Sequence, residues 1–196
     1  MPESSAALQT SQRDIRNEYR RRRAALSDEQ RSVASSRIAD AVVRTPYFLR
    51  SICIACYLSL ADEVDTWAII ERAWRRKKKI FAPVTGPDRL LTFRQVTPNT
   101  GLIVNEFGIL EPEPGTEISA RQLDLVLTPL VAYDDDRRRI GMGGGYYDRT
   151  FAFLRNRRLL LKPKLVGLAF NCQRIEKIAE NPWDIPLYRV VTEGRV

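Results

Sequence analysis

Short apolar runs separated by helical patterns dominate this chain and limit the folds that it can adopt. The run at 52–58 is continuous and apolar, as expected for a strand that is buried on both faces. Similar runs lie at 80–84, 123–133 and 164–170. Strands that alternate with helices form βαβ units. We therefore predict an α/β fold, a three-layer Rossmann-like sandwich with a mainly parallel sheet flanked by helices.

The individual elements can be predicted from periodicity and from start and stop signals. Ser27 and Gln30 have the spacing of a capping box at the start of a helix, and Thr45-Pro46 ends that helix. Helices are expected at 15–26, 27–44, 66–79, 146–158 and 174–180. Strands are expected at 52–58, 80–84, 90–96, 123–133, 164–170 and 188–191, with loops around a short extended piece at 97–115.

The length of the chain, 196 residues, fits one domain that buries a sizeable core. Residues 1–11 are small and polar, so we expect a flexible N-terminal tail followed by a single α/β domain at 12–196. No apolar run approaches the roughly 20 residues that span a bilayer, and the N-terminus lacks the apolar stretch of a secretory signal. We expect a cytoplasmic monomer with no membrane partner.

The residue types available restrict the chemistry. The sequence contains no histidine, which excludes Ser-His-Asp and Cys-His catalysis and leaves oxygen ligands for any metal, as magnesium prefers. Cys53 and Cys56 form a C-x-x-C pattern inside a predicted strand, where positions three apart face opposite ways. We interpret them as buried strand residues and not as a redox or metal pair.

The formal net charge of +8 is compatible with several anionic partners. Nucleic acid, acidic membranes and small polyanions such as nucleotides or polyglutamates are all attracted to a basic surface. The basic clusters are scattered at 20–23, 75–79, 137–139 and 155–164, each typical of a solvated face or a helix end. Charge alone does not choose among these partners, and we expect no nucleic acid.

A glycine-rich segment at 141–145 separates a predicted strand from a predicted helix. Glycines allow positive φ and leave backbone N–H groups open to an anion, and a helix N-terminus favours phosphate. The segment lacks the Lys-Ser/Thr of a P-loop and the last glycine of G-x-G-x-x-G. A phosphate cradle and a tight turn are therefore both open interpretations. Asp148, which follows Tyr146 and Tyr147, is suited either to cap the helix or to hold magnesium beside a phosphate.

Four ordered motifs give the chain a specific resemblance. They are RIGMGGGYYDR at 139–149, LSLADEVDT at 58–66, LTPLVAYD at 127–134 and WDIPL at 183–187, with a basic first helix around Ile15 and Arg16. Together they resemble the family of 5-formyltetrahydrofolate cyclo-ligases, also called 5,10-methenyltetrahydrofolate synthetases, over nearly the whole chain.

The resemblance implies an activity. Members of this family use Mg-ATP to convert 5-formyltetrahydrofolate to 5,10-methenyltetrahydrofolate with release of ADP and phosphate. Whether the substrate is polyglutamylated is left open by the sequence. The formyl oxygen takes the γ-phosphoryl group, and N10 then closes the ring. Such chemistry demands positioning and charge neutralisation more than a histidine base.

The resemblance also implies site residues. Catalysis is assigned to Arg139, Tyr146 and Asp148. ATP binding is assigned to Gln12, Arg13, Arg16, Arg139, Gly141, Met142, Gly143, Gly144, Gly145, Tyr146 and Tyr147. Folate binding is assigned to Leu58, Glu63, Met142, Gly143, Gly144, Gly145 and Tyr146. Magnesium is assigned to Asp148 and Asp184.

Two features depart from the family pattern. The family often has a lysine four residues before the arginine that corresponds to Arg16, where this chain has Gln12. Many relatives carry basic residues in the glycine-rich segment, where this chain has Met142 and Gly144. Backbone N–H groups and Arg139 therefore have more charge to neutralise.

Two other classes of function fit part of the sequence. A Rossmann-like nucleotide-binding oxidoreductase would fit the fold, but the G-x-G-x-x-G fingerprint is missing near the first strand. An RNA-binding protein would fit the charge, but the interleaved aromatic motifs of RNA-binding modules are missing.

Overall fold

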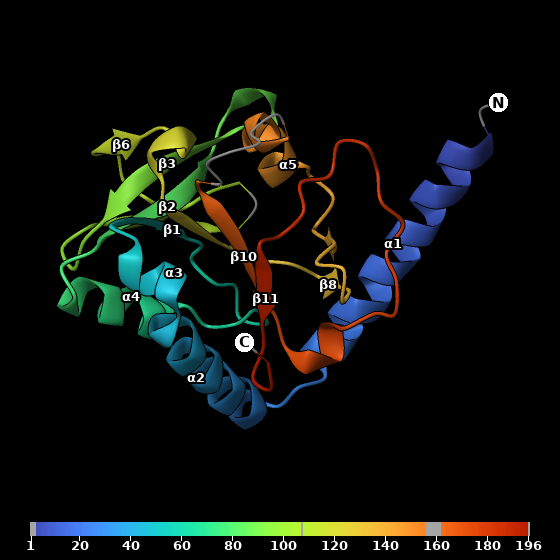
Figure 1. Cartoon of the computed structure of the whole chain (residues 1–196), viewed down its shortest axis with the longest axis horizontal. Helices are drawn as coiled ribbons and strands as arrows, with labels where there is room; N and C mark the ends of the chain where they lie inside the picture. The colour runs from blue at the N-terminus through green and yellow to red at the C-terminus, as the bar shows by residue number, and fades with distance from the viewer. Residues whose placement is uncertain (1–2, 107, 156–161, 196) are drawn as a thin grey trace.

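The structure is a computed structural model that describes residues 3–106, 108–155 and 162–195, with their side chains from residue 12 onwards. Its centre is a seven-stranded sheet (Figure 1). The strands, in spatial order, are β11 (Arg189–Val191), β10 (Lys164–Leu168), β7 (Leu125–Thr128), β1 (Cys53–Cys56), β2 (Lys79–Thr85), β3 (Leu91–Val96) and β6 (Glu117–Ile118).

The sheet is mainly parallel, as predicted. β1 lies between β2 and β7 and runs parallel to both, with Ile54 in register with Ile80 on one side and Leu125 on the other. β10 pairs parallel with β7 and β11. β3 and β6 extend the β2 side as antiparallel strands. Strand β1 is buried on both faces because it is central, which explains its continuous apolar sequence.

Helices cover the two faces unequally. One face is covered by α2 (Asp28–Arg44), α3 (Pro46–Arg50) and α4 (Trp67–Arg75), whose apolar residues join those of the strands in one core cluster. The other face has a thinner cover of α5 (Tyr146–Thr150) and the 3-10 turns η2 (Ala120–Gln122) and η3 (Ala152–Leu154), packed around Phe151. This arrangement confirms the predicted three-layer α/β fold.

Helix α1 (Glu3–Ala24) lies apart from these layers (Figure 1). It packs against a small hairpin of β8 (Ala132–Tyr133) and β9 (Arg139–Ile140), and buried Tyr19 contributes to that contact. The backbone of α1 begins at Glu3, so the range expected to be a tail is largely helical. The division of the chain at residue 12 stays a prediction.

Two predicted elements are wrong. The strand expected at 123–133 is divided into β7 and β8, with Pro129, which has no N–H to donate to a sheet, between them. The helix expected at 174–180 does not form, because its backbone donors bond elsewhere. The N–H of Ile175 donates to the carbonyl of Tyr133, and that of Ile178 donates to the Asp134 carboxylate.

Other elements have different bounds from those predicted. The loop region at 97–115 contains a hairpin of β4 (Leu102–Val104) and β5 (Leu110–Pro112), and α3 was not predicted. The helix expected at 66–79 ends at Arg75, and the hydroxyl of Thr66 donates to the carbonyl of Tyr57 and does not cap it. The helix expected at 146–158 ends at Thr150; the end of that range, from 156, lies outside the described residues. The capping box of Ser27 and Gln30 is confirmed.

The described part of the chain also contains two further 3-10 turns. The 3-10 turn η1 (Pro87–Arg89) joins β2 to β3, and η4 (Asn171–Gln173) follows β10. In the described part of the chain, no helix is long and apolar enough to cross a membrane.

The two strand cysteines face opposite sides of the sheet, as predicted. Cys56 lies in the core cluster beneath α2 and α4, whereas Cys53 packs against the cluster around Phe151. All three cysteines are free thiols. Burial raises the pKa of the Cys56 thiol to about 12.

We predict that Cys56 resists alkylation in the folded protein. Its thiol is inaccessible and stays protonated well above the ordinary pKa of a cysteine, whereas Cys53 and Cys172 are partly exposed. Labelling with iodoacetamide at about pH 8, near the ordinary pKa of a thiol, should modify Cys53 and Cys172 first. Mass spectrometry should find Cys56 modified only after denaturant is added, and equal labelling of all three thiols in folded protein would contradict the buried position.

Candidate active site

The order of the strands creates a crevice at the carboxyl ends of β1 and β7. The chain leaving β1 passes to β2 on one side, and the chain leaving β7 passes through the β8–β9 hairpin to β10 on the other. Neighbouring strands whose connections diverge leave a crevice between them, where open α/β sheets bind ligands. Two of the residues predicted to bind folate, Leu58 and Glu63, follow β1, and the others lie in or directly after the glycine-rich segment, which follows β9.

The glycine-rich segment forms the turn between β9 and α5. Gly143 has φ 100° and Gly145 has φ 71°, and Gly145 is the residue that precedes the first turn of α5. Both values lie in the left-handed region that favours glycine. Helix α5 has only five residues, so its dipole is weaker than the sequence led us to expect. Phosphate binding at this loop would depend mainly on N–H groups and side chains.

Arg16 lies directly beside this loop. Its Nε donates to the carbonyl of Gly141 at 3.0 Å, and its Nη2 donates to Oε1 of Gln12 at 3.0 Å. A β-carbon added to Gly143 would lie 3.5 Å from the guanidinium carbon of Arg16. Gln12 therefore orients Arg16 from one helical turn away. Arg13 is exposed and forms no hydrogen bond to the loop in the described residues.

Arg139 is buried in a closed set of contacts. Its Nη2 lies 2.7 Å from Oδ1 of Asp148, and its Nη1 donates to the carbonyl of Ile185 at 2.5 Å. The N–H of Ile185 donates to the same oxygen of Asp148 at 3.1 Å. The Arg139 side chain is 6% exposed, so this ion pair is largely shielded from water. These contacts join the start of α5 to the segment that carries Asp184.

The two predicted magnesium ligands lie in neighbouring segments. Asp184 directly precedes Ile185, which bonds to Asp148, and the Oδ2 of Asp184 accepts from the backbone N–H and the side-chain amide of Asn181. Among the described residues, no group of three or more His, Cys, Asp or Glu side chains is placed to hold a metal. Two carboxylates with remaining oxygens still fit magnesium, which commonly takes one or two carboxylates together with substrate phosphates.

The two tyrosines of the loop have different surroundings. The ring of Tyr146 is half-buried and lies against the place where a β-carbon of Gly144 would be, at 2.7 Å. Tyr147 stacks on Phe151 with ring centroids 6.2 Å apart. Burial, followed by the charge of Glu63, raises the pKa of the Tyr147 hydroxyl. Met142 is exposed at the tip of the loop.

Two of the predicted folate residues, Leu58 and Glu63, lie on the loop that follows β1. The Leu58 side chain is 4% exposed and packs in the core, so in this structure it faces away from solvent. Glu63 is also buried, and its Oε2 accepts from the N–H of Leu60 at 3.1 Å. Burial raises the pKa of the Glu63 carboxyl, and Arg23 opposes that shift.

A cavity of about 500 Å³ adjoins Glu63. Its lining includes the polar side chains of Ser35 and Ser59 and the ring of Trp67. Another cavity, of about 670 Å³, lies beside β3 and α5 and includes Arg149 and Phe153, but none of the predicted site residues. Of the predicted site residues, the smaller cavity includes Glu63, and the rest of its lining comes from α2, the loop after β1 and the start of α4.

Two arginines that connect segments of the candidate site, Arg23 and Arg149, were not predicted from the sequence. Arg23 was grouped with the solvated cluster at 20–23, yet it is 2% exposed and contacts Asp62 and Glu63. The signal was its spacing, because it lies seven residues after Arg16 and therefore on the same face of α1. Arg149 was also missed, and its Nη1 donates to the carbonyl of Gly144 at 2.8 Å.

An α/β sheet with a glycine-rich loop, an adjoining arginine and two carboxylates at its ligand-binding edge defines a class of enzymes that act on anionic small molecules. Known proteins identify the family within that class. Residues 8–193 match the 5-formyltetrahydrofolate cyclo-ligase family model, and the chain belongs to this family.

Individual relatives agree with this assignment. The 5-formyltetrahydrofolate cyclo-ligase of Escherichia coli strain K12 is 36% identical over 181 residues, which cover 90% of this chain and 97% of the relative. That of Haemophilus influenzae is 34% identical, with 90% and 95% covered. The NMR structure of 5,10-methenyltetrahydrofolate synthetase from Aquifex aeolicus has a TM-score of 0.79 at 28% identity, with 94% and 90% covered. These matches favour the cyclo-ligase hypothesis over an oxidoreductase or an RNA-binding protein.

We predict that Asp148→Asn and Asp184→Asn differ in stability. The substitution at Asp148 would leave the buried Arg139 without its counter-charge, which should cost about 1–3 kcal/mol of unfolding free energy. The substitution at Asp184 would keep an oxygen that can accept from Asn181, so the cost should be about 0.5 kcal/mol or less. Urea denaturation of both variants measures the difference. Equal stabilities would mean that the Arg139–Asp148 pair contributes nothing to the fold.

Proposed function

We propose that this protein catalyses the ATP- and magnesium-dependent conversion of 5-formyltetrahydrofolate to 5,10-methenyltetrahydrofolate, with release of ADP and phosphate. The observation that carries the proposal is the position of Arg16 against the glycine-rich loop, at the edge of the crevice, in a chain of the cyclo-ligase family. The activities for which the Escherichia coli relative and the Aquifex aeolicus protein are named support the same reaction.

The proposed reaction has two steps. The formyl oxygen attacks the γ-phosphorus of ATP and ADP leaves, which converts a poor leaving group into a phosphate. N10 then attacks the activated carbon, loses its proton, and phosphate departs with the formyl oxygen. Neither step requires a histidine, because catalysis depends on holding the two substrates in line and on neutralising phosphate charge.

We assign the phosphates of ATP to the loop at 141–145 and to Arg16. A guanidinium binds phosphate through two parallel N–H groups, and the loop supplies backbone N–H groups nearby. The contact with Gln12 holds Arg16 toward the loop before ATP arrives. Arg139 is already bonded to Asp148, so in this proposal it positions Asp148 and contacts phosphate only if that ion pair is exchanged.

We assign magnesium to Asp148 and Asp184, directly or through water. Both bind their partners mainly through one carboxylate oxygen, Oδ1 in Asp148 and Oδ2 in Asp184. The other oxygen of each is suited to a hard cation. Magnesium, when bound, would neutralise charge that develops on the transferred phosphoryl group. The protein groups supply the positions of the two carboxylates.

We assign folate to the β1 side of the crevice. The cavity beside Glu63 has a volume typical of small-molecule sites. A carboxylate such as Glu63 accepts hydrogen bonds from the amino and ring N–H groups of a pterin. We assign to Tyr146, which is half-buried on the glycine-rich loop, the role of covering the substrate from the ATP side. The cytoplasmic location, the monomeric state and the binding of polyglutamylated folates stay predictions.

A spectroscopic assay tests the proposed function. Purified protein is mixed with Mg-ATP and 5-formyltetrahydrofolate, and the methenyl chromophore and ADP are followed together. We expect both products in equal amounts, and only when ATP is present. Folded protein that yields neither product would refute the proposal, and binding of NAD(P)H without binding of ATP would favour an oxidoreductase.

We predict that Arg16→Ala raises the apparent KM for ATP by about tenfold or more, because loss of one charge-assisted phosphate contact costs at least about 1.4 kcal/mol. Arg21→Ala is a matched control, since Arg21 is exposed on the same helix and pairs only with Glu18 in the described residues. An unchanged KM for ATP in Arg16→Ala would place Arg16 outside the phosphate site.

A further inference from the structure

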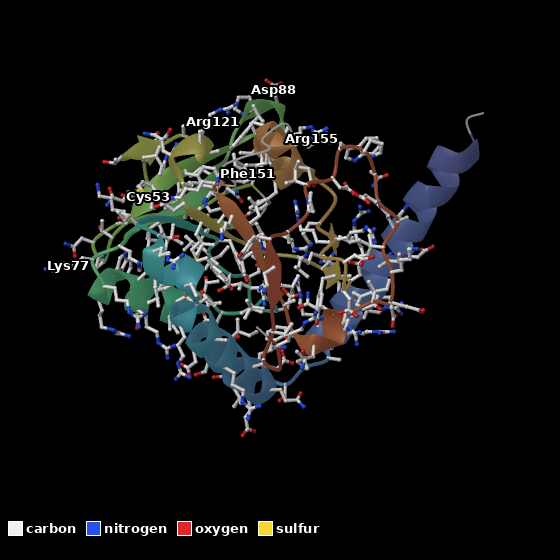
Figure 2. All side chains as sticks on the ribbon, viewed as in Figure 1. Cys53, Lys77, Asp88, Arg121, Phe151 and Arg155 are labelled. Atoms are coloured by element: carbon white, nitrogen blue, oxygen red, sulfur yellow. The ribbon has the colours of Figure 1, made fainter. Side chains whose placement is uncertain are left out.

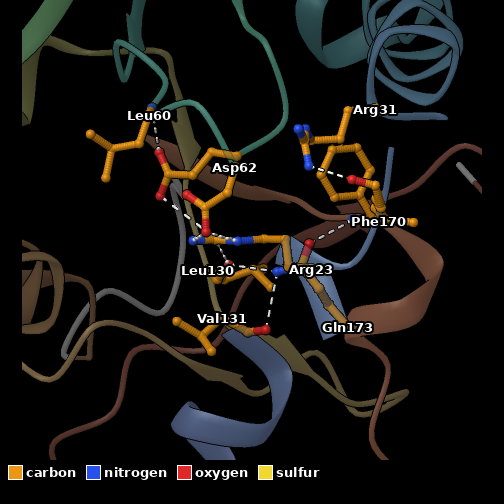
Figure 3. A network of polar contacts seen from close by, with 10 residues as sticks. Arg23, Arg31, Leu60, Asp62, Leu130, Val131, Phe170 and Gln173 are labelled. Carbon is orange, nitrogen blue, oxygen red and sulfur yellow. Dashed lines mark hydrogen bonds and ion pairs between the residues drawn. The ribbon is translucent and has the colours of Figure 1, made fainter. Parts of the chain in front are cut away.

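Arg23 forms a buried ion-pair network at the end of α1 (Figure 3). Its Nε and Nη2 donate to Oδ2 of Asp62 at 3.0 and 2.7 Å. Its Nη1 donates to the carbonyl of Leu130 at 3.4 Å and lies 3.7 Å from Oε1 of Glu63. The side chain is 3% exposed, so one guanidinium is shared among two carboxylates and a carbonyl almost out of contact with water.

The partners of Arg23 come from the two sides of the crevice. Asp62 and Glu63 follow β1, whereas Leu130 follows β7. These are the neighbouring strands whose connections diverge, so Arg23 bridges the opening between them. Gln173 extends the network, because its Nε2 donates to the carbonyls of Leu130 and Val131 at 2.8 and 3.0 Å.

Arg23 and Arg16 lie on the same face of one helix. Seven residues in an α-helix correspond to about two turns and about 10 Å. At one end of this stretch of α1, Arg16 contacts the glycine-rich loop. At the other end, Arg23 contacts the loop after β1. Helix α1 is held between these points by Tyr19, which is buried against the β8–β9 hairpin. A rigid helix therefore joins the proposed ATP site to the proposed folate site.

A role in stability alone does not account for this network well. A buried ion pair seldom stabilises a fold more than well-packed apolar side chains of the same volume. What it does provide is a fixed position for each charge, because a guanidinium has a planar set of donors with defined directions. The charge whose position concerns function is that of Glu63.

We propose that Arg23 is a positioning residue for folate binding. It holds the Glu63 carboxylate, and the loop that carries it, at a fixed distance from the glycine-rich loop, so that the formyl group of the substrate meets the γ-phosphate of ATP. Arg23 touches neither substrate in this proposal and acts through Glu63 and Asp62. The inference rests on the proposed function.

The charges around Glu63 predict how Arg23 affects it. Two charged groups face Glu63: Arg23 on α1, and Asp62 on the same loop as Glu63. The hydroxyls of Tyr57 and Tyr147 also lie near the Glu63 carboxyl. Burial raises the pKa of Glu63, Asp62 raises it further, and Arg23 lowers it. Without Arg23 the carboxyl would take up a proton at a higher pH. A protonated carboxyl is a poorer acceptor for the N–H groups of a pterin.

The test compares Arg23→Met and Arg23→Lys with the control Arg21→Met, using the assay for methenyl product. We expect Arg23→Met to raise the KM for 5-formyltetrahydrofolate about tenfold or more and to change the KM for ATP less than about twofold. Arg23→Lys should recover part of the loss because it restores the charge without the planar donors. Arg21→Met should match the wild type.

The pH dependence gives a readout that a purely structural role would not move. In the wild type, folate affinity should fall as pH drops and Glu63 becomes protonated. In Arg23→Met this fall should begin at a higher pH, because the pKa of Glu63 is no longer lowered by a neighbouring cation. A fall at the same pH in both proteins would overturn the link between Arg23 and Glu63.

A double-mutant cycle covers the case in which Arg23→Met folds poorly. Asp62→Asn weakens the hold on Arg23 while the arginine remains, and it should raise the KM for folate without a comparable change for ATP.

In a Glu63→Gln background, Arg23→Lys should add little to the loss of folate affinity. The proposal would be overturned if the effects of Arg23→Lys and Glu63→Gln on folate affinity were fully additive. It would also be overturned if Asp62→Asn changed the KM for folate and the KM for ATP equally. Wild-type protein without any turnover would instead refute the proposed function.

Discussion

The parallel pairing of β1 with both β2 and β7 is the constraint on which the rest of the structure depends. It places β1 at the centre of the sheet and sends the connections of β1 and β7 in opposite directions. The resulting crevice brings together the loop with Glu63, the glycine-rich loop and the segment with Asp184. Buried apolar side chains pack on both faces of the sheet, as can be followed among the side chains drawn in Figure 2, and this core gives the loops a rigid base. The order of the strands therefore determines where the residues predicted for the site lie.

Ion pairs organise the crevice from both sides. On the side proposed for ATP, Arg139 is bonded to Asp148 and to the carbonyl of Ile185, so an arginine expected to neutralise phosphate instead holds a carboxylate. On the side proposed for folate, Arg23 forms ion pairs with Asp62 and Glu63. Buried charges of this kind need partners with defined geometry, and each arginine thereby determines where a negative charge stands. Arg16, in contrast to the side chains of Arg139 and Arg23, is partly exposed and lies beside the glycine-rich loop.

The sequence predicted the parts of this structure that depend on local pattern. The apolar run of β1 and the capping box of Ser27 were enough to predict a central strand and the start of α2. Pro129 is a local signal in the sequence that divides the predicted strand. That Asp134 takes the backbone donor of Ile178 was not predictable, since this outcome depends on a distant contact. Arg23 was missed for the same reason. Basic residues in a helix are usually solvated, and only the tertiary structure shows that this one is buried.

Hydrogen–deuterium exchange with both substrates tests the central claim most directly, namely that they meet across the crevice between β1 and β7. Exchange is measured for free protein, and for protein with 5-formyltetrahydrofolate and a non-hydrolysable ATP analogue in the presence of magnesium. The account predicts protection in both the loop at 57–66 and the loop at 139–148 when both ligands are bound. Protection confined to the region of the cavity beside β3 and α5, with neither loop affected, would contradict it.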